Sequence, residues 1–267
     1  MMLPVGEIFC DWLDVTYGSG SPVLADVSTF VTENGATCTH GDERRRTYRF
    51  DSDIYKGTLV LESAARYSRV SASGAVLMHL RSLDLYLKLI STLSSEAHNV
   101  SRLDLARDEH RDGAEMIKSM RRKYSRKGVT CGLGRKALPV SYVTSVRADG
   151  KETGTFYAGQ RTRARTTGRV YDKQAQMLAV HGEHIPPTVR TEITLRGENG
   201  RPGPNLYDAI HPEKLFWHVA SPELLKAPVG VEEWTSGWGG SWVYEMPEKL
   251  LPAESLARMV EYCPTLD

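Results

Sequence analysis

Alternating polar and apolar residues predict three β-strands at 102–106, 169–173 and 190–196. Side chains alternate between the two faces of a strand, so the polar residues of each segment should share one face. Those residues are Arg102 and Asp104, then Arg169, Tyr171 and Lys173, then Arg190, Glu192, Thr194 and Arg196. The pattern predicts an open face with a tyrosine, two carboxylates and several arginines. Such a set is suited to cutting a phosphodiester with a tyrosine and a metal ion.

Helical spacing and turn signals predict the surrounding elements. Leucines recur at intervals of three and four between residues 75 and 93, which predicts one helix there. A second helix is predicted from Asp112, a candidate N-cap, to Lys127, with Gly128 placed to end it. Asp149-Gly150 predicts a hairpin between strands 140–146 and 154–159. Short helices are predicted at 174–181, 212–219 and 252–262.

The two halves of the sequence show a weak internal repeat. Each half reads β-β-α-β, from Gly57-Thr58 and from Gly154-Thr155. In this register Asp104 corresponds to Glu192, and Tyr171 corresponds to Ser71. A duplication would place both R-x-acid strands near the middle of one antiparallel sheet. The match is short, and chance is the other explanation.

Bulk composition is that of an ordinary globular protein. The 267 residues are 40% hydrophobic and 25% charged, enough for one large domain or two small ones. No apolar run approaches the length of about 20 residues that spans a bilayer, and the start lacks the features of a signal peptide. We therefore expect a cytoplasmic protein that does not engage a membrane. Four widely spaced cysteines argue against a disulfide scaffold or a zinc knuckle.

Positive charge is concentrated locally although the net charge is only +1. Residues 118–136 carry eight Lys or Arg and no acid, and residues 160–173 carry five against Asp172 alone. Local fields decide anion binding, so the clusters favour contacts with DNA phosphates. A solvated helix face and a basic loop are the simpler alternative. The residues expected to hold DNA are Arg161, Arg163, Arg165, Arg121, Arg122, Lys123, Arg126 and Lys127.

Four motifs in order resemble the rolling-circle replication initiators of the transfer-type Rep family, found in some plasmids and filamentous phages. They are D-W-L-D-V-T at 11–16, R-L-D-L-A-R-D at 102–108, the block from T-F-Y-A-G-Q-R to R-V-Y-D-K at 155–173, and R-T-E-I-T-L-R at 190–196. Each motif alone is weak, and their order over residues 10–200 is fairly specific. Gln160 departs from the family, where Ser is more usual. No motif covers the last third of the chain.

The resemblance implies a fold, an activity and partners. The fold would be α+β, a largely antiparallel sheet with helices packed on it. Residues 1–200 would form a catalytic origin-nicking domain, and residues 201–267 an extension packed on the same domain. The activity would be origin-specific nicking of double-stranded DNA through a 5′-phosphotyrosine intermediate, with magnesium or manganese. Partners would be origin DNA, the nicked single strand, and host helicase and polymerase; a homodimer would supply a second tyrosine.

The resemblance assigns a role to each residue of the set. Tyr171 is the expected nucleophile, with Arg169 and Lys173 favouring its phenolate and holding the scissile phosphate. Asp104 and Glu192 are the expected metal ligands, and Asp108 joins them if its strand continues. The alternative for Tyr171 is a half-buried structural role, in which case Tyr157 is the next candidate nucleophile. The alternative for Asp104 and Glu192 is pairing with arginines instead of binding a metal.

The sequence lacks the signatures of two other classes of DNA-cutting enzyme. The His-hydrophobic-His signature of other nicking enzymes and the H-x-x-R box of tyrosine recombinases are absent from the sequence. Tryptophans between residues 232 and 242 could stack on single-stranded DNA, although loop anchors are the stronger interpretation. The serious rival is a non-enzymatic protein of a mobile element, a DNA-binding regulator or packaging factor with a structural Tyr171.

Overall fold

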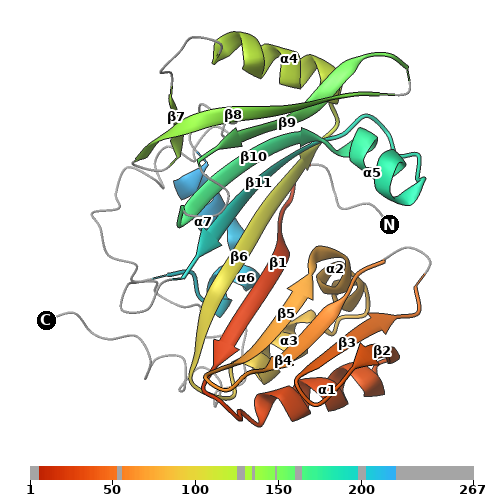
Figure 1. Ribbon diagram of the computed structural model, residues 1–267, viewed down its shortest axis with the longest axis vertical. Coiled ribbons are helices and arrows are strands. Elements are labelled where there is room, and N and C mark those ends of the chain that lie inside the picture. The colour runs from red at the N-terminus through yellow and green to blue at the C-terminus, as the bar shows by residue number, and fades with distance from the viewer. Residues whose placement is uncertain are drawn as a thin grey trace, which may run out of the picture. The chain divides into compact units, whose positions relative to one another are not determined.

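The computed structural model describes residues 6–52, 56–124, 130–133, 136–147, 149–159, 164–197 and 203–220 (Figure 1). The chain divides into two compact units, which we call the N-terminal unit and the central unit. Of the described residues, those in 10–103 and 197–210 form the N-terminal unit, and those in 6–9, 104–196 and 211–220 form the central unit. Strands β1 (Ile8–Tyr17) and β6 (His98–Glu109) contribute residues to both.

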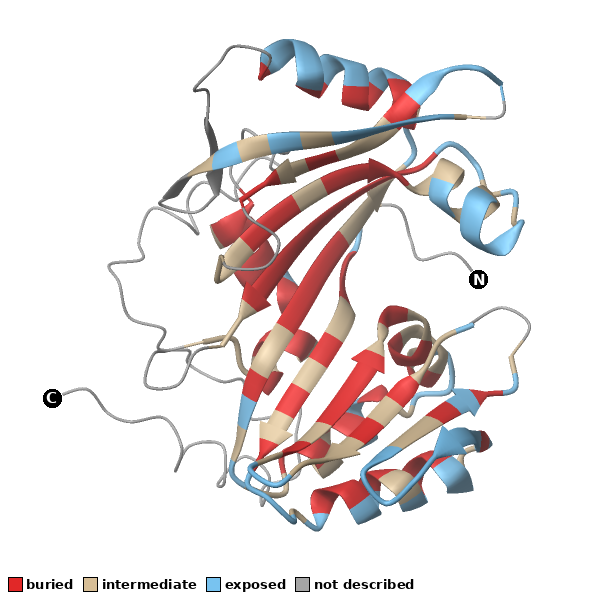
Figure 2. Cartoon of the chain, in the orientation of Figure 1, coloured by how far each residue is buried: buried red, intermediate tan, exposed pale blue. Residues whose placement is uncertain are grey.

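The N-terminal unit is a sheet with strand order β2-β3-β4-β5-β1-β6. Its further strands are β2 (Ala36–Gly41), β3 (Arg45–Phe50), β4 (Leu59–Ser63) and β5 (Ser68–Ser73). Its helices are α1 (Val23–Glu33), α2 (Gly74–Ser82), α3 (Tyr86–Leu93) and α6 (Leu206–Ile210). Alternate residues of β1 and β5, among them Leu13, Val15, Val70 and Ala72, are buried, and α1 buries an apolar stripe (Figure 2). The core is therefore almost wholly apolar.

The central unit is a sheet with strand order β6-β11-β10-β9-β8-β7. Its strands are β7 (Thr130–Leu133), β8 (Lys136–Val146), β9 (Glu152–Ala158), β10 (Thr166–Asp172) and β11 (Val189–Arg196). Its helices are α4 (Gly113–Lys123), α5 (Lys173–His181) and α7 (Pro212–Val219). Helix α4 packs on β9 with Met116, Ile117 and Met120 buried and its charged side exposed (Figure 2). The buried ring of Phe156 lies 5.2 Å from the rings of both Tyr124 and Tyr142.

The predicted fold class is confirmed: the chain is α+β, with an antiparallel sheet and helices packed on it. The hairpin across Asp149-Gly150 is confirmed by the pairing of β8 with β9. Asp112 caps α4 as predicted, since its side chain accepts hydrogen bonds from the backbone N–H groups of Ala114 and Glu115. The predicted helix at 212–219 is α7.

The prediction of one helix over residues 75–93 is wrong. Helix α2 ends at Ser82 and α3 begins at Tyr86. Between them Asp84 has a φ of 58°, a left-handed conformation that a continuous α-helix does not admit. Helix α1 was not predicted, although its buried valines follow a helical period. The predicted helix at 252–262 lies outside the described residues.

The internal repeat is not confirmed. In the central unit β10 pairs directly with β11, whereas in the N-terminal unit β5 pairs with β1, which lies between β5 and β6. The division at residue 200 stays a prediction. In the described part of the chain, no helix has the length and apolar character needed to cross a membrane.

Candidate functional site

Strand register brings four of the predicted site residues onto one face of the central unit. Tyr171 lies opposite Arg190 and Arg169 lies opposite Glu192 in the β10–β11 pair. Directly opposed residues of an antiparallel pair point to the same side of the sheet. Tyr157 on β9 lies opposite Arg169, so the runner-up tyrosine is a neighbour on the same face. The sequence prediction that these side chains share a face is confirmed.

Two arginines on this face form ion pairs with carboxylates. Arg169 pairs with Glu192, whose side chain is fully buried. Arg190 donates from Nε and Nη2 to the two oxygens of Asp108, each at 2.7 Å, in a bidentate geometry. Strand β6 runs to Glu109, so Asp108 does continue the strand of Asp104, as its predicted contribution requires. The face therefore holds matched positive and negative charge.

Arg169 is the electrostatic centre of the face. Burial acts to lower the pKa of its guanidinium, but Glu192, Tyr171 and Asp104 oppose this effect and the net result is a raised pKa. Its Cζ lies 5.3 Å from the centre of the Tyr171 ring, within the range of a cation–π contact. Arg169 thus stays cationic and interacts electrostatically with Tyr171 and with both predicted metal ligands, Asp104 and Glu192.

The same face is buried and not open, contrary to the sequence prediction. Tyr171 is 6% exposed, Asp104 1% and Glu192 0%. A buried carboxylate is stable only when it is paired or hydrogen-bonded, and the pair with Arg169 meets this requirement for Glu192. A scissile phosphate would therefore have to reach an enclosed site.

The carboxylates partly fit a divalent metal. Asp104 and Glu192 offer the hard oxygen donors that magnesium and manganese prefer. Within the described ranges, no group of three or more His, Cys, Asp or Glu side chains is placed to hold a metal ion. A metal held by these two carboxylates would therefore take its remaining ligands from water and phosphate oxygens.

Two predicted members of the face lie elsewhere. Strand β10 ends at Asp172, so Lys173 is the first residue of α5, and its Nζ donates to Oε1 of Gln176 at 2.9 Å. The predicted alignment of Lys173 with Tyr171 is therefore wrong. Arg102 belongs to the N-terminal unit, where its guanidinium lies 4.9 Å from the centre of the Trp12 ring.

The predicted DNA-binding residues are only partly described. Arg121, Arg122 and Lys123 are exposed in the last turn of α4, and Arg121 pairs with Glu152. Arg165 is half-buried just before β10. Arg161, Arg163, Arg126, Lys127 and the tryptophans between 232 and 242 lie outside the described residues.

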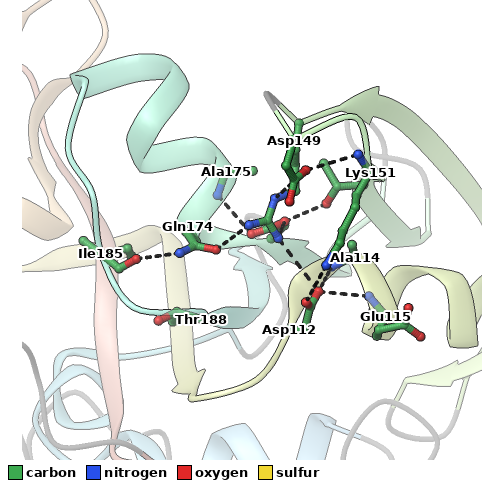
Figure 3. A network of polar contacts seen from close by, with 12 residues as sticks. Asp112, Ala114, Glu115, Asp149, Lys151, Gln174, Ala175, Ile185 and Thr188 are labelled. Atoms are coloured by element: carbon green, nitrogen blue, oxygen red, sulfur yellow. Dashed lines mark hydrogen bonds and ion pairs between the residues drawn. The ribbon is translucent and has the colours of Figure 1, made fainter.

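Sequence reasoning missed a polar junction next to the tyrosine. Arg147 follows β8, and its guanidinium lies among the side chains of Asp112, Asp149, Asp172 and Gln174 (Figure 3). The local signal was Asp172 followed by a short helix, which is the pattern of an N-cap. The long-range partner Arg147 had no such signal.

No protein-family model matches the chain, and no curated protein matches it. Among solved structures, one similar chain is a crystal structure of the di-domain ARO/CYC BexL from the BE-7585A biosynthetic pathway. It is 8% identical, the match covers 76% of this chain and 92% of that chain, and the TM-score is 0.23. A likeness at that TM-score carries no argument about this chain.

Proposed function

We propose that the protein is a metal-dependent DNA nicking and joining enzyme that initiates rolling-circle replication. The observation that carries the proposal is the β10–β11 register, which sets Tyr171 and Arg169 opposite Arg190 and Glu192 on one face. The ordered motifs resembling Rep initiators predicted this tyrosine and this glutamate. Side chains that act together on one phosphate must lie on the same face, and this register places the four side chains there.

The proposed chemistry is phosphoryl transfer to a phenol. The Oη of Tyr171 attacks the scissile phosphorus, a new P–O bond forms to the 5′-phosphate, and the bond to the 3′-oxygen breaks. The phenol proton passes to solvent and the 3′-oxygen takes a proton from solvent to leave as a hydroxyl, so atoms and charge balance. A phenol has an unperturbed pKa near about 10, so it must lose its proton as it attacks, and the Arg169 guanidinium lies 5.3 Å from the centre of the Tyr171 ring. A bound divalent metal would offset charge on the phosphate and the leaving oxygen.

The arginines suit the phosphate, because guanidinium groups bind phosphate and carboxylate with the same bidentate geometry. Arg190 already makes such a contact with Asp108. A phosphate on this face would compete with Asp108 and Glu192 for the two arginines. The carboxylates released by that exchange would be available to a metal ion. In this proposal the ion pairs hold the arginines and carboxylates in position until DNA binds.

A second candidate function is favoured by the burial of the same face. Tyr171 is 6% exposed and Glu192 is paired with Arg169, as expected of a structural tyrosine and a structural ion pair. Under this alternative the protein is a non-enzymatic DNA-binding regulator or packaging protein. The exposed cations of α4 would serve either function.

The test is covalent capture of DNA without knowledge of the origin. The protein is incubated with a random-sequence single-stranded DNA library and Mg²⁺ or Mn²⁺, and denaturant-resistant complexes are isolated, digested and analysed by mass spectrometry. We expect a nucleotide on the peptide containing Tyr171, no adduct with Tyr171→Phe, and an adduct with the matched control Tyr157→Phe. DNA binding in a filter assay without any adduct supports the regulator. An adduct that survives in Tyr171→Phe rejects the nucleophile.

A further inference from the structure

The end of β10 that carries Tyr171 is fixed at a junction of four segments. The strand ends at Asp172, which is also the N-cap of α5. The N-terminus of α4 and the β8–β9 turn meet it there, since Arg147 of this turn pairs with both Asp112 and Asp172. All of these residues belong to the central unit.

Asp172 uses both carboxylate oxygens in this junction. Oδ1 accepts from the backbone N–H of Ala175 at 2.9 Å, which caps α5. Oδ2 accepts from Oγ1 of Thr153 at 2.8 Å and from Nη1 of Arg147 at 3.4 Å. The residue is 3% exposed, so water cannot replace these partners readily. The residue next to Tyr171 is therefore held from several directions.

Arg147 extends the restraint to neighbouring segments. Its Nη2 donates to Oε1 of Gln174 at 2.7 Å, and Gln174 donates in turn to the carbonyl of Ile185 at 2.8 Å. Its guanidinium also lies 3.8 Å from Oδ1 of Asp112, the cap of α4. The planar fork of arginine suits a site with several acceptors, and a lysine would reach fewer of them.

Packing leaves the Asp172 carboxylate little room to move. A Cβ at Gly113 would lie 2.4 Å from Cγ of Asp172, so the α4 backbone lies directly against this side chain. The hydrogen bonds fix the direction of the carboxylate, and the glycine contact fixes its position.

We propose that Asp172 and Arg147 are positioning residues that set the orientation of the Tyr171 ring. The peptide between Tyr171 and Asp172 transmits the position of the carboxylate to the phenol, whose Oη must lie in line with the scissile bond. A misplacement of about 1 Å lowers the rate of an oriented reaction by about 100-fold. This inference rests on the proposed function, and its test separates the two.

The discriminating variant is Asp172→Asn. Asparagine caps a helix as well as aspartate does, so its Oδ1 can keep the bond to the N–H of Ala175 and α5 is retained. Its Nδ2 then replaces the oxygen that faces Thr153 and Arg147, and the charge that pairs with Arg147 is lost. The matched control is Asp149→Asn, which also removes a carboxylate near Arg147, at 3.7 Å, from a half-exposed position. A helix-capping role alone predicts equal behaviour of the two variants.

The first readout does not need activity. With 3-fluorotyrosine at position 171, we expect Asp172→Asn to shift or broaden the fluorine resonance and Asp149→Asn to leave it unchanged. A spectrum of Asp172→Asn that superimposes on the wild type overturns the inference. If Asp172→Asn does not fold, Arg147→Lys carries the same test, since it keeps the cation and removes the fork.

The second readout is the single-turnover rate of adduct formation on the captured DNA sequence. We expect Asp172→Asn to be slower by about tenfold or more, with an unchanged dissociation constant for DNA. A wild-type rate in Asp172→Asn rejects the positioning role and leaves the nicking function intact. A wild-type protein that forms no adduct rejects the proposed function, and the fluorine spectrum then still decides whether Asp172 orients the ring.

Discussion

Strands β1 and β5 of the N-terminal unit bury Leu13, Val15, Val70 and Ala72, whereas β10 and β11 of the central unit bury Arg190 and Glu192 beside Tyr171. Among the described residues, the buried charged side chains of the central unit are Asp104, Asp172, Arg190 and Glu192. The buried charged side chain among the described residues of the N-terminal unit is Asp208, which accepts from the backbone N–H of Asn205 at 2.9 Å.

This difference between the units bears on function. Replacing a buried ion pair by apolar side chains of similar size is often neutral or stabilising, so burial of charge is poor evidence for a stabilising role. The N-terminal unit shows that the same kind of sheet in this chain can be built on an apolar core. Stability of the fold alone therefore does not explain the buried charges of the central unit.

The strongest test of the comparison breaks one ion pair in each unit. Glu192→Gln leaves the Arg169 cation without its counter-charge, and we expect a loss of about 3 kcal/mol in the free energy of unfolding. Glu62→Gln breaks the pair with Arg69, whose side chain is 37% exposed, and we expect less than about 1 kcal/mol. Urea unfolding with hydrogen exchange of peptides from each unit measures both. Equal losses would show that burial does not distinguish the pairs.

Glycine packing provides the next test. Gly113→Ala would place a methyl group against Asp172, and overpacking of this kind destabilises by about 2 kcal/mol. Gly18→Ala in the N-terminal unit is the control, because a Cβ there meets no atom within 4 Å. Thermal unfolding should show a clear decrease in Tm for the first variant and almost none for the second. An unchanged Tm for Gly113→Ala would mean that the junction accommodates the methyl group.

Helix capping differs among helices of both units, since α7 has no side-chain bond at its cap and Asn205 accepts from the backbone N–H of Asp208 at the start of α6. Helices α4 and α5 carry aspartate caps with side-chain hydrogen bonds, whereas α1, α2 and α3 have no such bond at their caps. We expect Asp112→Ala to lower the free energy of unfolding by about 1 kcal/mol, and Asp112→Asn to lower it by much less because asparagine also caps. Hydrogen exchange of residues 113–123 would locate the effect. Identical exchange in the two variants would assign the loss to the contact with Arg147 instead.

These features divide into those that local sequence specifies and those that it does not. Asp149-Gly150 and Asp112 act within a few residues, so the hairpin and the cap were predictable. The shared face of Arg169 and Tyr171 follows from strand alternation within β10. The opposition of Arg169 to Glu192 depends on the register between strands, which the sequence of neither strand specifies alone. Lys173 was misplaced because the cap at Asp172 ends the strand one residue earlier.

The smallest expected effect concerns pH and the N-terminal unit. Burial lowers the pKa of His98, and a hydrogen bond to the carbonyl of Glu96 only partly opposes this effect. Histidine in the unfolded chain titrates near about 6.5, so below that pH the unfolded state binds a proton that the folded state resists. Stability contributed by His98 is therefore complete above pH about 6.5 and is lost as the pH falls through the lower folded-state pKa.

The variant His98→Gln should reduce the dependence of the free energy of unfolding on pH below about 6.5. We expect the difference in free energy of unfolding between pH 7.5 and pH 5 to shrink relative to the wild type. Burial also lowers the pKa of His79, which is present in both proteins, so the comparison isolates His98. Hydrogen exchange should confine the change to the N-terminal unit, since Tyr17, the ring neighbour of His98, belongs to the same unit. An equal pH slope in the two proteins, or a change in β10 and β11, would contradict the assignment and make the central unit the acid-sensitive part.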